Sequence, residues 1–209
     1  MGMYTLKSLR CGFTIMVRPL RGYWEMKYDK RGSYPAACVL AVLALLASLV
    51  SVQYTGFIFS GFNPYTFNLL RQVSSLAIPF GLFCVVNWAV TTILNGEGTM
   101  GDIFMATCYA LLPYTVCSLL STVLSWFFTQ SEGVFLGFVS TLGLLWSALL
   151  LFCGIMTVHQ YTVKKTLGTF VLTVVGIMLV LFITIMFTSI FDKMFNYFLG
   201  LYNEIRLRM

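Results

Sequence analysis

Five long stretches without a charged residue follow one another along this chain. A helix needs about 20 mostly apolar residues to cross the hydrocarbon core of a bilayer, and each stretch is long enough. Because lipid offers the backbone no hydrogen-bond partners, every crossing segment is expected to be helical. The sequence therefore predicts an all-α integral membrane protein, a bundle of five transmembrane helices. The stretches are Gly32–Leu70, Gln72–Gly96, Ile103–Ser131, Gly133–Val163 and Thr166–Phe191.

The composition excludes a water-soluble fold. Hydrophobic residues make up 59% of the chain and charged residues only 10%, whereas about a quarter of the residues in a soluble domain are charged. The connections between the stretches are short, so a single helical bundle is expected. We predict the five spans at Pro35–Phe57, Leu76–Leu94, Ile103–Phe127, Val134–Val158 and Thr166–Ile190.

The positive charges predict the orientation. Seven of the thirteen Lys and Arg residues precede the first span, and Lys164 and Lys165 lie between the fourth and the fifth. The positive-inside rule places such segments in the cytoplasm. We therefore expect a protein of the cell membrane with a cytoplasmic N-terminus, and five spans then put the C-terminus outside. The net charge of +6 reflects this placement, so the expected partner is the lipid bilayer and not nucleic acid.

The chain divides into three predicted parts. Residues 1–34 form a basic amphipathic segment, residues 35–190 the five-span domain, and residues 191–209 an amphipathic tail. The tail either extends the fifth span or lies on the outer membrane surface. Its apolar stripe comprises Phe191, Phe195, Phe198, Tyr202 and Ile205.

An amphipathic helix is predicted over Pro19–Arg31. Proline suits the first turn of a helix, and apolar residues then recur at spacings of three and four. Such a helix lies in the headgroup layer with its aromatic face down, or it packs on the bundle as a cytosolic cap. Basic charge together with Trp and Tyr favours the headgroup layer. The stripe comprises Leu20, Tyr23, Trp24, Lys27 and Tyr28.

Polar residues enter the membrane in spans two and three, where they are costly and often functional. Pro113 removes a backbone donor, which frees the carbonyl of Tyr109 and predicts a kink. Counted from Asn95 and Asp102, Asn87 lies about 12 Å deep and Tyr109 about 10 Å deep at 1.5 Å per residue. We hypothesise that Asn87 and the Tyr109–Pro113 kink form a buried polar contact between the two spans.

The connection between these spans contains Gly96, Gly98 and Gly101 at the spacing of a dinucleotide-binding fingerprint. That fingerprint requires a preceding strand and a soluble βαβ unit, whereas membrane spans flank these glycines. We interpret the connection as a tight cytoplasmic turn, with Asp102 capping span three. Glu97 and Asp102 make the turn acidic, so it is expected to contact a partner or the basic N-terminus of the chain.

The pattern of polar residues does not favour catalysis. His159 is the only histidine, so the sequence offers no histidine cluster for a metal. No Asp or Glu lies inside a predicted span, and no serine stands in a GxSxG motif. We predict no enzymatic activity, no catalytic or metal-binding residues and no cofactor. His159 is interpreted as marking a helix end at the cytoplasmic interface.

The order of these features resembles the Yip family of Ypt/Rab-interacting proteins. The matching residues form one candidate interaction or structural motif, and Glu97 differs from the basic or neutral residue expected between the two glycines. Arg18-Pro19, Gly22-Tyr23, Arg31-Gly32-Ser33 and His159-Gln160-Tyr161 are similar to short prokaryote-type members. The motif comprises Asn87, Trp88, Gly96, Glu97, Gly98, Asp102, Tyr109 and Pro113.

For eukaryotic members, the resemblance implies vesicle trafficking and a cytosolic region that binds Rab-type GTPases. The 34 residues before Pro35 leave little room for such a region. For short members, it implies a non-catalytic membrane protein that assists a larger assembly, such as an ABC-type transporter. We therefore predict a scaffold or accessory subunit of a transport or trafficking assembly, and a homo-oligomer stays open. The alternative is a small permease or transporter subunit that moves a solute through polar spans two and three.

Overall fold

The computed structural model describes residues 11–208 except 61, 62, 64 and 66, and every regular element in this part of the chain is helical. Residues 11–17 are also helical. The elements are α2 (Pro19–Lys27), α3 (Tyr34–Tyr54), α4 (Leu69–Ile93), α5 (Met100–Ala110), α6 (Leu112–Leu124), the 3₁₀ turn η1 (Gln130–Glu132), α7 (Gly133–His159) and α8 (Val163–Arg208).

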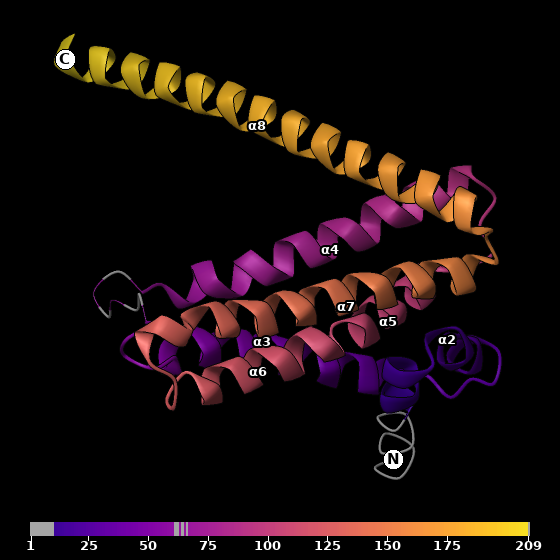
Figure 1. Ribbon diagram of the computed structural model, residues 1–209. Coiled ribbons are helices and arrows are strands. Elements are labelled where there is room, and N and C mark those ends of the chain that lie inside the picture. Colours follow the sequence, from indigo (N-terminus) through magenta and orange to yellow (C-terminus); the bar gives the residue numbers. More distant parts are fainter. Residues whose placement is uncertain (1–10, 61–62, 64, 66, 209) are drawn as a thin grey trace.

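Five helical segments are long and apolar enough to cross a membrane, with α5 and α6 together forming one of them. Each overlaps one predicted span, which confirms the fold class. Figure 1 shows that α2, the α4–α5 connection and the α7–α8 connection lie at one end of the bundle, which we call the inner end. The connections after α3 and α6 lie at the opposite, outer end.

Small residues let the spanning helices approach closely. Four alanines of α3 are buried, and contacts of α3 with α5 and α6 cover this face. A Cβ atom at Gly143 of α7 would lie 2.5 Å from the Cβ atom of Cys117 in α6. Lipid tails are as apolar as the side chains, so close packing is what holds such helices together. The buried alanines are Ala36, Ala37, Ala44 and Ala47.

The predicted kink at Pro113 is a break between two helices. Leu111 separates α5 from α6, and Pro113 stands in the first turn of α6. The break leaves the N–H of Tyr114 free of the helical ladder, and this N–H donates to Oγ of Ser147 in α7 at 2.9 Å. A serine on a neighbouring helix thus satisfies a backbone donor that lipid cannot satisfy.

The fifth spanning helix, α8, has 46 residues and is therefore about 69 Å long at 1.5 Å per residue. Its first half packs on α4, where a Cβ atom at Gly176 would lie 2.7 Å from Val86. Beyond this contact α8 leaves the bundle at an angle (Figure 1). The tail extends span five, which is one of the two arrangements that the sequence left open.

Candidate functional site

The two turns at the inner end of the bundle are hydrogen-bonded to each other. The N–H of Gly98 donates to Nδ1 of His159 at 3.2 Å. The hydroxyl of Tyr161 donates to the carbonyls of Thr91 and Leu94, each at 3.3 Å. The rings of His159 and Tyr161 stack with their centroids 5.3 Å apart. We call Lys27, Gly96–Gly98, His159 and Tyr161 the inner junction.

Two glycines of the α4–α5 turn are required by this close approach. A Cβ atom at Gly96 would overlap Nδ1 of His159, and one at Gly98 would lie 2.5 Å from Val158 and 2.7 Å from Cε1 of His159. Contacts this short essentially never occur in folded proteins, so only glycine fits without rearrangement. The glycine spacing that resembles a nucleotide motif therefore serves helix-end packing here.

The cation of Lys27 connects the N-terminal segment to both turns. Its Nζ donates to the carbonyl of Val158 at 2.6 Å and to that of Glu97 at 3.4 Å. Free carbonyls at the end of α7 carry partial negative charge, which a cation stabilises. The side chain of Glu97 itself is exposed. The acidic turn thus contacts the chain's own basic N-terminal segment, but through the backbone carbonyl of Glu97 and not through its carboxylate.

Residues 11–31, which we call the N-terminal cap, pack on the bundle. Tyr23 is fully buried, and its hydroxyl donates to the carbonyl of Ala106 in α5 at 3.3 Å. Its ring lies against Gly154, where an added Cβ atom would be 3.0 Å away. The exposed part of the predicted stripe includes Leu20, Trp24 and Tyr28. The cap packed on the bundle, the less favoured of the two sequence predictions, is therefore what the structure shows for Tyr23.

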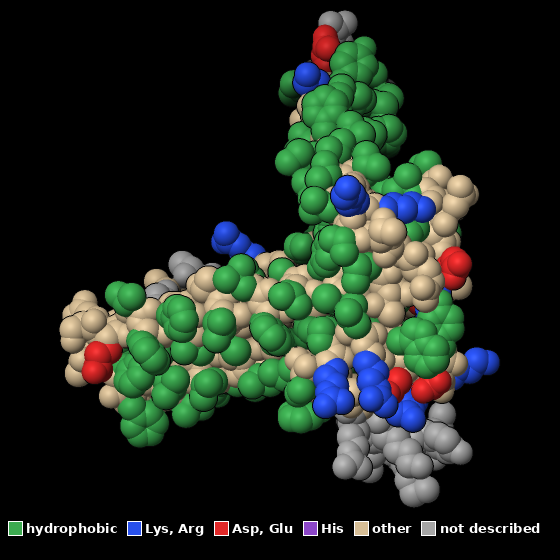
Figure 2. Space-filling model, turned by 45° about the vertical axis from the view of Figure 1, so that its right-hand side comes forward, with side chains coloured by type: hydrophobic (Ala, Val, Ile, Leu, Met, Phe, Trp, Pro, Cys, Tyr) green, Lys and Arg blue, Asp and Glu red, His purple; other side chains and the backbone are tan. Residues whose placement is uncertain are grey.

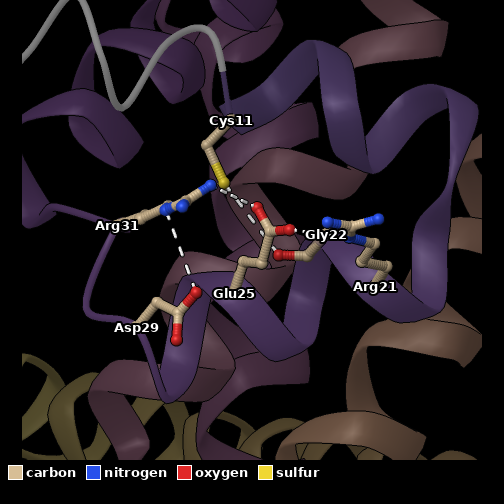
Figure 3. A network of polar contacts seen from close by, with 6 residues as sticks. All are labelled: Cys11, Arg21, Gly22, Glu25, Asp29 and Arg31. Atoms are coloured by element: carbon tan, nitrogen blue, oxygen red, sulfur yellow. Dashed lines mark hydrogen bonds and ion pairs between the residues drawn. The ribbon is translucent and has the colours of Figure 1, made fainter.

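An ion-pair network joins residues within the cap to one another (Figure 3). The carboxylate of Glu25 accepts from Arg21 at 2.9 Å and from Arg31 at 2.7 Å, and Arg31 also lies 3.9 Å from Asp29. The hydrogen bond from Arg21 holds the pKa of Glu25 below its ordinary value, and the charge of Arg31 acts in the same direction. The network joins α2 to the loop that leads into α3.

Asp102 helps to cap α5, with a partner that the sequence analysis did not name. Thr99 is the N-cap residue, and its N–H and hydroxyl donate to Oδ2 of Asp102 at 3.0 and 2.8 Å. The N–H of Asp102 donates in turn to the Thr99 hydroxyl at 3.3 Å. This reciprocal pair is a capping box, and it fixes where the α4–α5 turn ends.

The polar residues predicted to meet between spans two and three have different partners. Asn87 is fully buried, and its Nδ2 donates to Oγ1 of Thr173 in α8 at 3.1 Å. Tyr109 is also fully buried, but it packs against Gly12 and hydrogen-bonds to the backbone of Ser33. The hypothesised contact between the two side chains is therefore corrected, because they have different neighbours.

A comparison with protein families decides what kind of chain this is. The family model of the Yip1 domain matches residues 13–185. The chain belongs to the Yip1 domain family. The match begins in the N-terminal cap and ends within α8, so it covers the inner junction and confirms the resemblance drawn from the short motifs. No curated protein and no solved structure matches the chain.

Within this Yip1 domain, the candidate motif separates into four places. Gly96, Glu97, Gly98 and Asp102 lie in the turn at the inner end, and Asn87 faces α8. Tyr109 and Pro113 are buried beside the cap and α7. Trp88 is 42% exposed on the outside of α4.

Three residues of the inner junction were not identified as a site from the sequence of the Yip1 domain. His159 does end α7 as predicted, but it is 2% exposed and accepts a hydrogen bond. Tyr161 and Lys27 carried no prediction of a junction. Their signal was weak, because one His, one Tyr and one Lys near helix ends are also typical of ordinary membrane interfaces.

The fifth span of the Yip1 domain carries a buried stripe of threonines that faces α4. Each hydroxyl donates to the carbonyl four residues earlier, which satisfies its donor and leaves its oxygen as an acceptor. Thr173 uses this acceptor for Asn87. These threonines recur every three or four residues, and this spacing could have predicted a shared helix face from the sequence. The stripe comprises Thr166, Thr169 and Thr173.

A cavity of about 250 Å³ lies between α3, α6 and α7, towards the outer end of the Yip1 domain. All of its lining residues except Val52 carry a hydroxyl group, although the cavity is formed by spanning helices. Ser140 donates to Ser121 at 3.2 Å across the α6–α7 interface. Among the described residues, no group of three or more His, Cys, Asp or Glu side chains is arranged to hold a metal. The lining includes Ser51, Thr55, Tyr114, Ser118, Ser121, Thr122 and Ser140.

Proposed function

We propose that this Yip1 domain protein is a non-catalytic scaffold or accessory subunit of a membrane transport or trafficking assembly. Membership of the family supports the class of function. The observation that carries the proposal is the inner junction, where the cap, the α4–α5 turn and the end of α7 are joined by hydrogen bonds. A surface that is already ordered loses little entropy on binding, which suits a docking platform.

The rim of this platform, beside the inner junction, exposes groups that a partner can reach. The carboxylate of Glu97 is exposed, and so is the ring of Tyr28, whose hydroxyl accepts a hydrogen bond from Gln160 at 2.9 Å. Exposed aromatic residues next to charges are typical of interface hot spots. A neighbouring membrane protein, such as an ABC-type transporter, is the proposed partner, and self-association of this chain is the simplest competing arrangement.

The proposed orientation has a cytoplasmic N-terminus and an external C-terminus in the cell membrane. Figure 2 shows Lys and Arg side chains gathered at one end of the bundle. Lys27, Lys164 and Lys165 belong to segments at this inner end, and cytoplasmic loops of membrane proteins carry such an excess. The platform then faces the cytoplasm.

Site-specific crosslinking tests the proposal in the native cells. A photo-crosslinking amino acid in place of Glu97 is expected to join the chain to one membrane transport or trafficking protein in near-stoichiometric yield. The same amino acid in place of Gln130, which is exposed at the outer end, is the matched control and is expected to give no such product. Crosslinks from position 97 only to lipid or to copies of this chain would overturn the scaffold proposal.

The hydroxyl-lined cavity favours a second candidate function, that of a small permease or transporter subunit. Its place between α3, α6 and α7 differs from the predicted path through spans two and three. Ser118→Cys in the cavity lining is then expected to react with a membrane-impermeant maleimide. Val123→Cys, exposed on the outside of the same helix, serves as control and is expected to stay unlabelled. An unreactive Cys at position 118 would remove the basis for a water-accessible path.

A further inference from the structure

The N-terminal cap touches the spanning helices on their sides and not only at their ends. An added Cβ atom at Gly12 would lie 2.7 Å from Leu112 and 3.4 Å from the ring of Tyr109. The indole N–H of Trp146 in α7 donates to the carbonyl of Met16 at 3.3 Å. These contacts show how far along the bundle the cap reaches.

The rise of about 1.5 Å per residue in a helix gives the depth of these contacts in the membrane. Tyr109 lies about 10 Å from Asp102 along α5. Along α7, Gly154, which meets Tyr23, lies about 8 Å from the inner end, and Trp146, which meets Met16, lies about 20 Å from it. α7 has 27 residues and spans about 40 Å, whereas the hydrocarbon core measures about 30 Å. With α7 centred in the core, its ends extend about 5 Å beyond the core on each side. The contacts of the cap along α7 then lie between about 3 Å and about 15 Å inside the core, which is the depth range of the inner leaflet.

The opposite side of the cap is apolar and uncovered. Phe13 is 70% exposed, Val17 62% and Leu20 52%. Trp24 is 48% exposed, although its neighbour Tyr23 is fully buried. In a soluble region this row of side chains would face water, at a cost of about 25 cal/mol for each Å² of apolar surface. At the depth of the cap, the row meets acyl chains instead.

Cationic side chains border this apolar row. Arg18 and Arg21 are exposed on the cap, and the side chain of Arg21 is 68% exposed while it pairs with Glu25. Long basic side chains extend from a buried position towards the headgroups, and each adds attraction to an anionic membrane surface. A second copy of the cap would bring the same cations together and is disfavoured by their repulsion.

We propose that residues 11–27 lie in the inner leaflet as a half-embedded pair of short helices, which bind anionic phospholipid. Phe13, Val17, Leu20 and Trp24 contact acyl chains, while Arg18 and Arg21 contact phosphate groups. The pair occupies one leaflet only, because Lys27 returns the chain to the end of α7. This inference concerns the lipid contact alone and stands whether or not a protein partner docks on the inner junction.

Fluorescence quenching by lipid measures the depth of Trp24. The full chain and its Trp24→Phe variant are reconstituted in phosphatidylglycerol-containing vesicles with lipids brominated near the headgroup or near the bilayer centre. The difference between the two proteins isolates the emission of Trp24. We expect several-fold stronger quenching of this difference by the shallow bromines than by aqueous iodide. Quenching by iodide alone would place the cap in water and overturn the proposal.

The amount of phospholipid that stays bound to the purified protein tests the proposed role of Arg18 and Arg21. The number of phosphatidylglycerol molecules that stay bound to the detergent-purified full chain is counted by native mass spectrometry. Arg18→Gln combined with Arg21→Gln is expected to lower this number at least two-fold. Lys193→Gln combined with Arg206→Gln removes the same charge from the far part of α8 and is expected to leave it unchanged. Equal loss in both variants, or no loss in either, would contradict a specific role of the cap.

Discussion

At the scale of single residues, the inner junction depends on two glycines, which have no side chain, as much as on His159 and Tyr161. The backbone at Gly96 and Gly98 approaches His159 more closely than any Cβ atom allows. The hydrogen bond from the Gly98 N–H to His159 is possible only at this distance. The histidine thus orders the turn, because its Nδ1 accepts the hydrogen bond from the Gly98 N–H.

The first prediction concerns Gly98. Gly98→Ala is expected to lower stability by about 1–3 kcal/mol, because the new methyl group overlaps Val158 and His159 and forces the turn to shift. The thermal unfolding midpoint in mild detergent measures this loss. Gly137→Ala is the control, since an added Cβ there meets nothing within 4 Å and alanine favours the helix. If both variants behave alike, the close approach is not a constraint.

The second prediction concerns the buried amide of Asn87. Its bond to Thr173 joins span two to span five, and such bonds contribute about 0.6–1.7 kcal/mol in membrane proteins. A double-mutant cycle with Asn87→Leu and Thr173→Val measures this coupling free energy through reversible unfolding in detergent micelles. The double variant is expected to lose less stability than the sum of the single losses. Strict additivity would show that the bond contributes nothing.

At the scale of elements, the cap is held on the bundle by charge and by buried side chains, among them Tyr23, Ile15 and Met26. α2 has two functions, since Tyr23 anchors it to α5 and α7 while Glu25 ties it to Arg21 and Arg31. Exposed surface ion pairs contribute little by themselves. This carboxylate is 11% exposed and shared by two guanidinium groups, so its protonation is expected to make the cap sensitive to pH.

The third prediction follows from the lowered pKa of Glu25. A carboxylate with a lowered folded-state pKa contributes stability that is present above its unfolded value of 4.5 and is lost as the pH falls through the folded value. Backbone hydrogen exchange in the cap, corrected for intrinsic rates, is therefore expected to accelerate below pH 4.5 relative to exchange in α7. Glu25→Gln should remove this acceleration. An unchanged pH profile in the variant would assign it to other groups.

The elements themselves show where prediction from the sequence succeeds. Five spans, their order and the break at Pro113 follow from the positions of charges and of one proline, because lipid imposes length and helicity. Rotation about each helix axis was not predictable in the same way. Asn87 was assigned to Tyr109 instead of Thr173, since a span that is apolar all round gives no signal for its facing side.

At the scale of the whole molecule, sequence analysis identified the membrane fold and the family but not the inner junction. The junction joins Lys27, Gly98 and His159, which are far apart in the chain. Each of these residues is ordinary at a helix end, and only the packing of three segments brings them together. The threonine stripe of α8 is the opposite case, because its helical spacing was visible and only its partner was unknown.

The length of α8 has a mechanical consequence for the molecule. About 69 Å of continuous helix cannot fit within a 30 Å core without extending beyond it or tilting strongly. Because α8 has no break between Val163 and Arg208, the tail moves with the span as a rigid lever. A tilt of a few degrees beside Asn87 therefore becomes a displacement of several ångströms at the far tip of the helix.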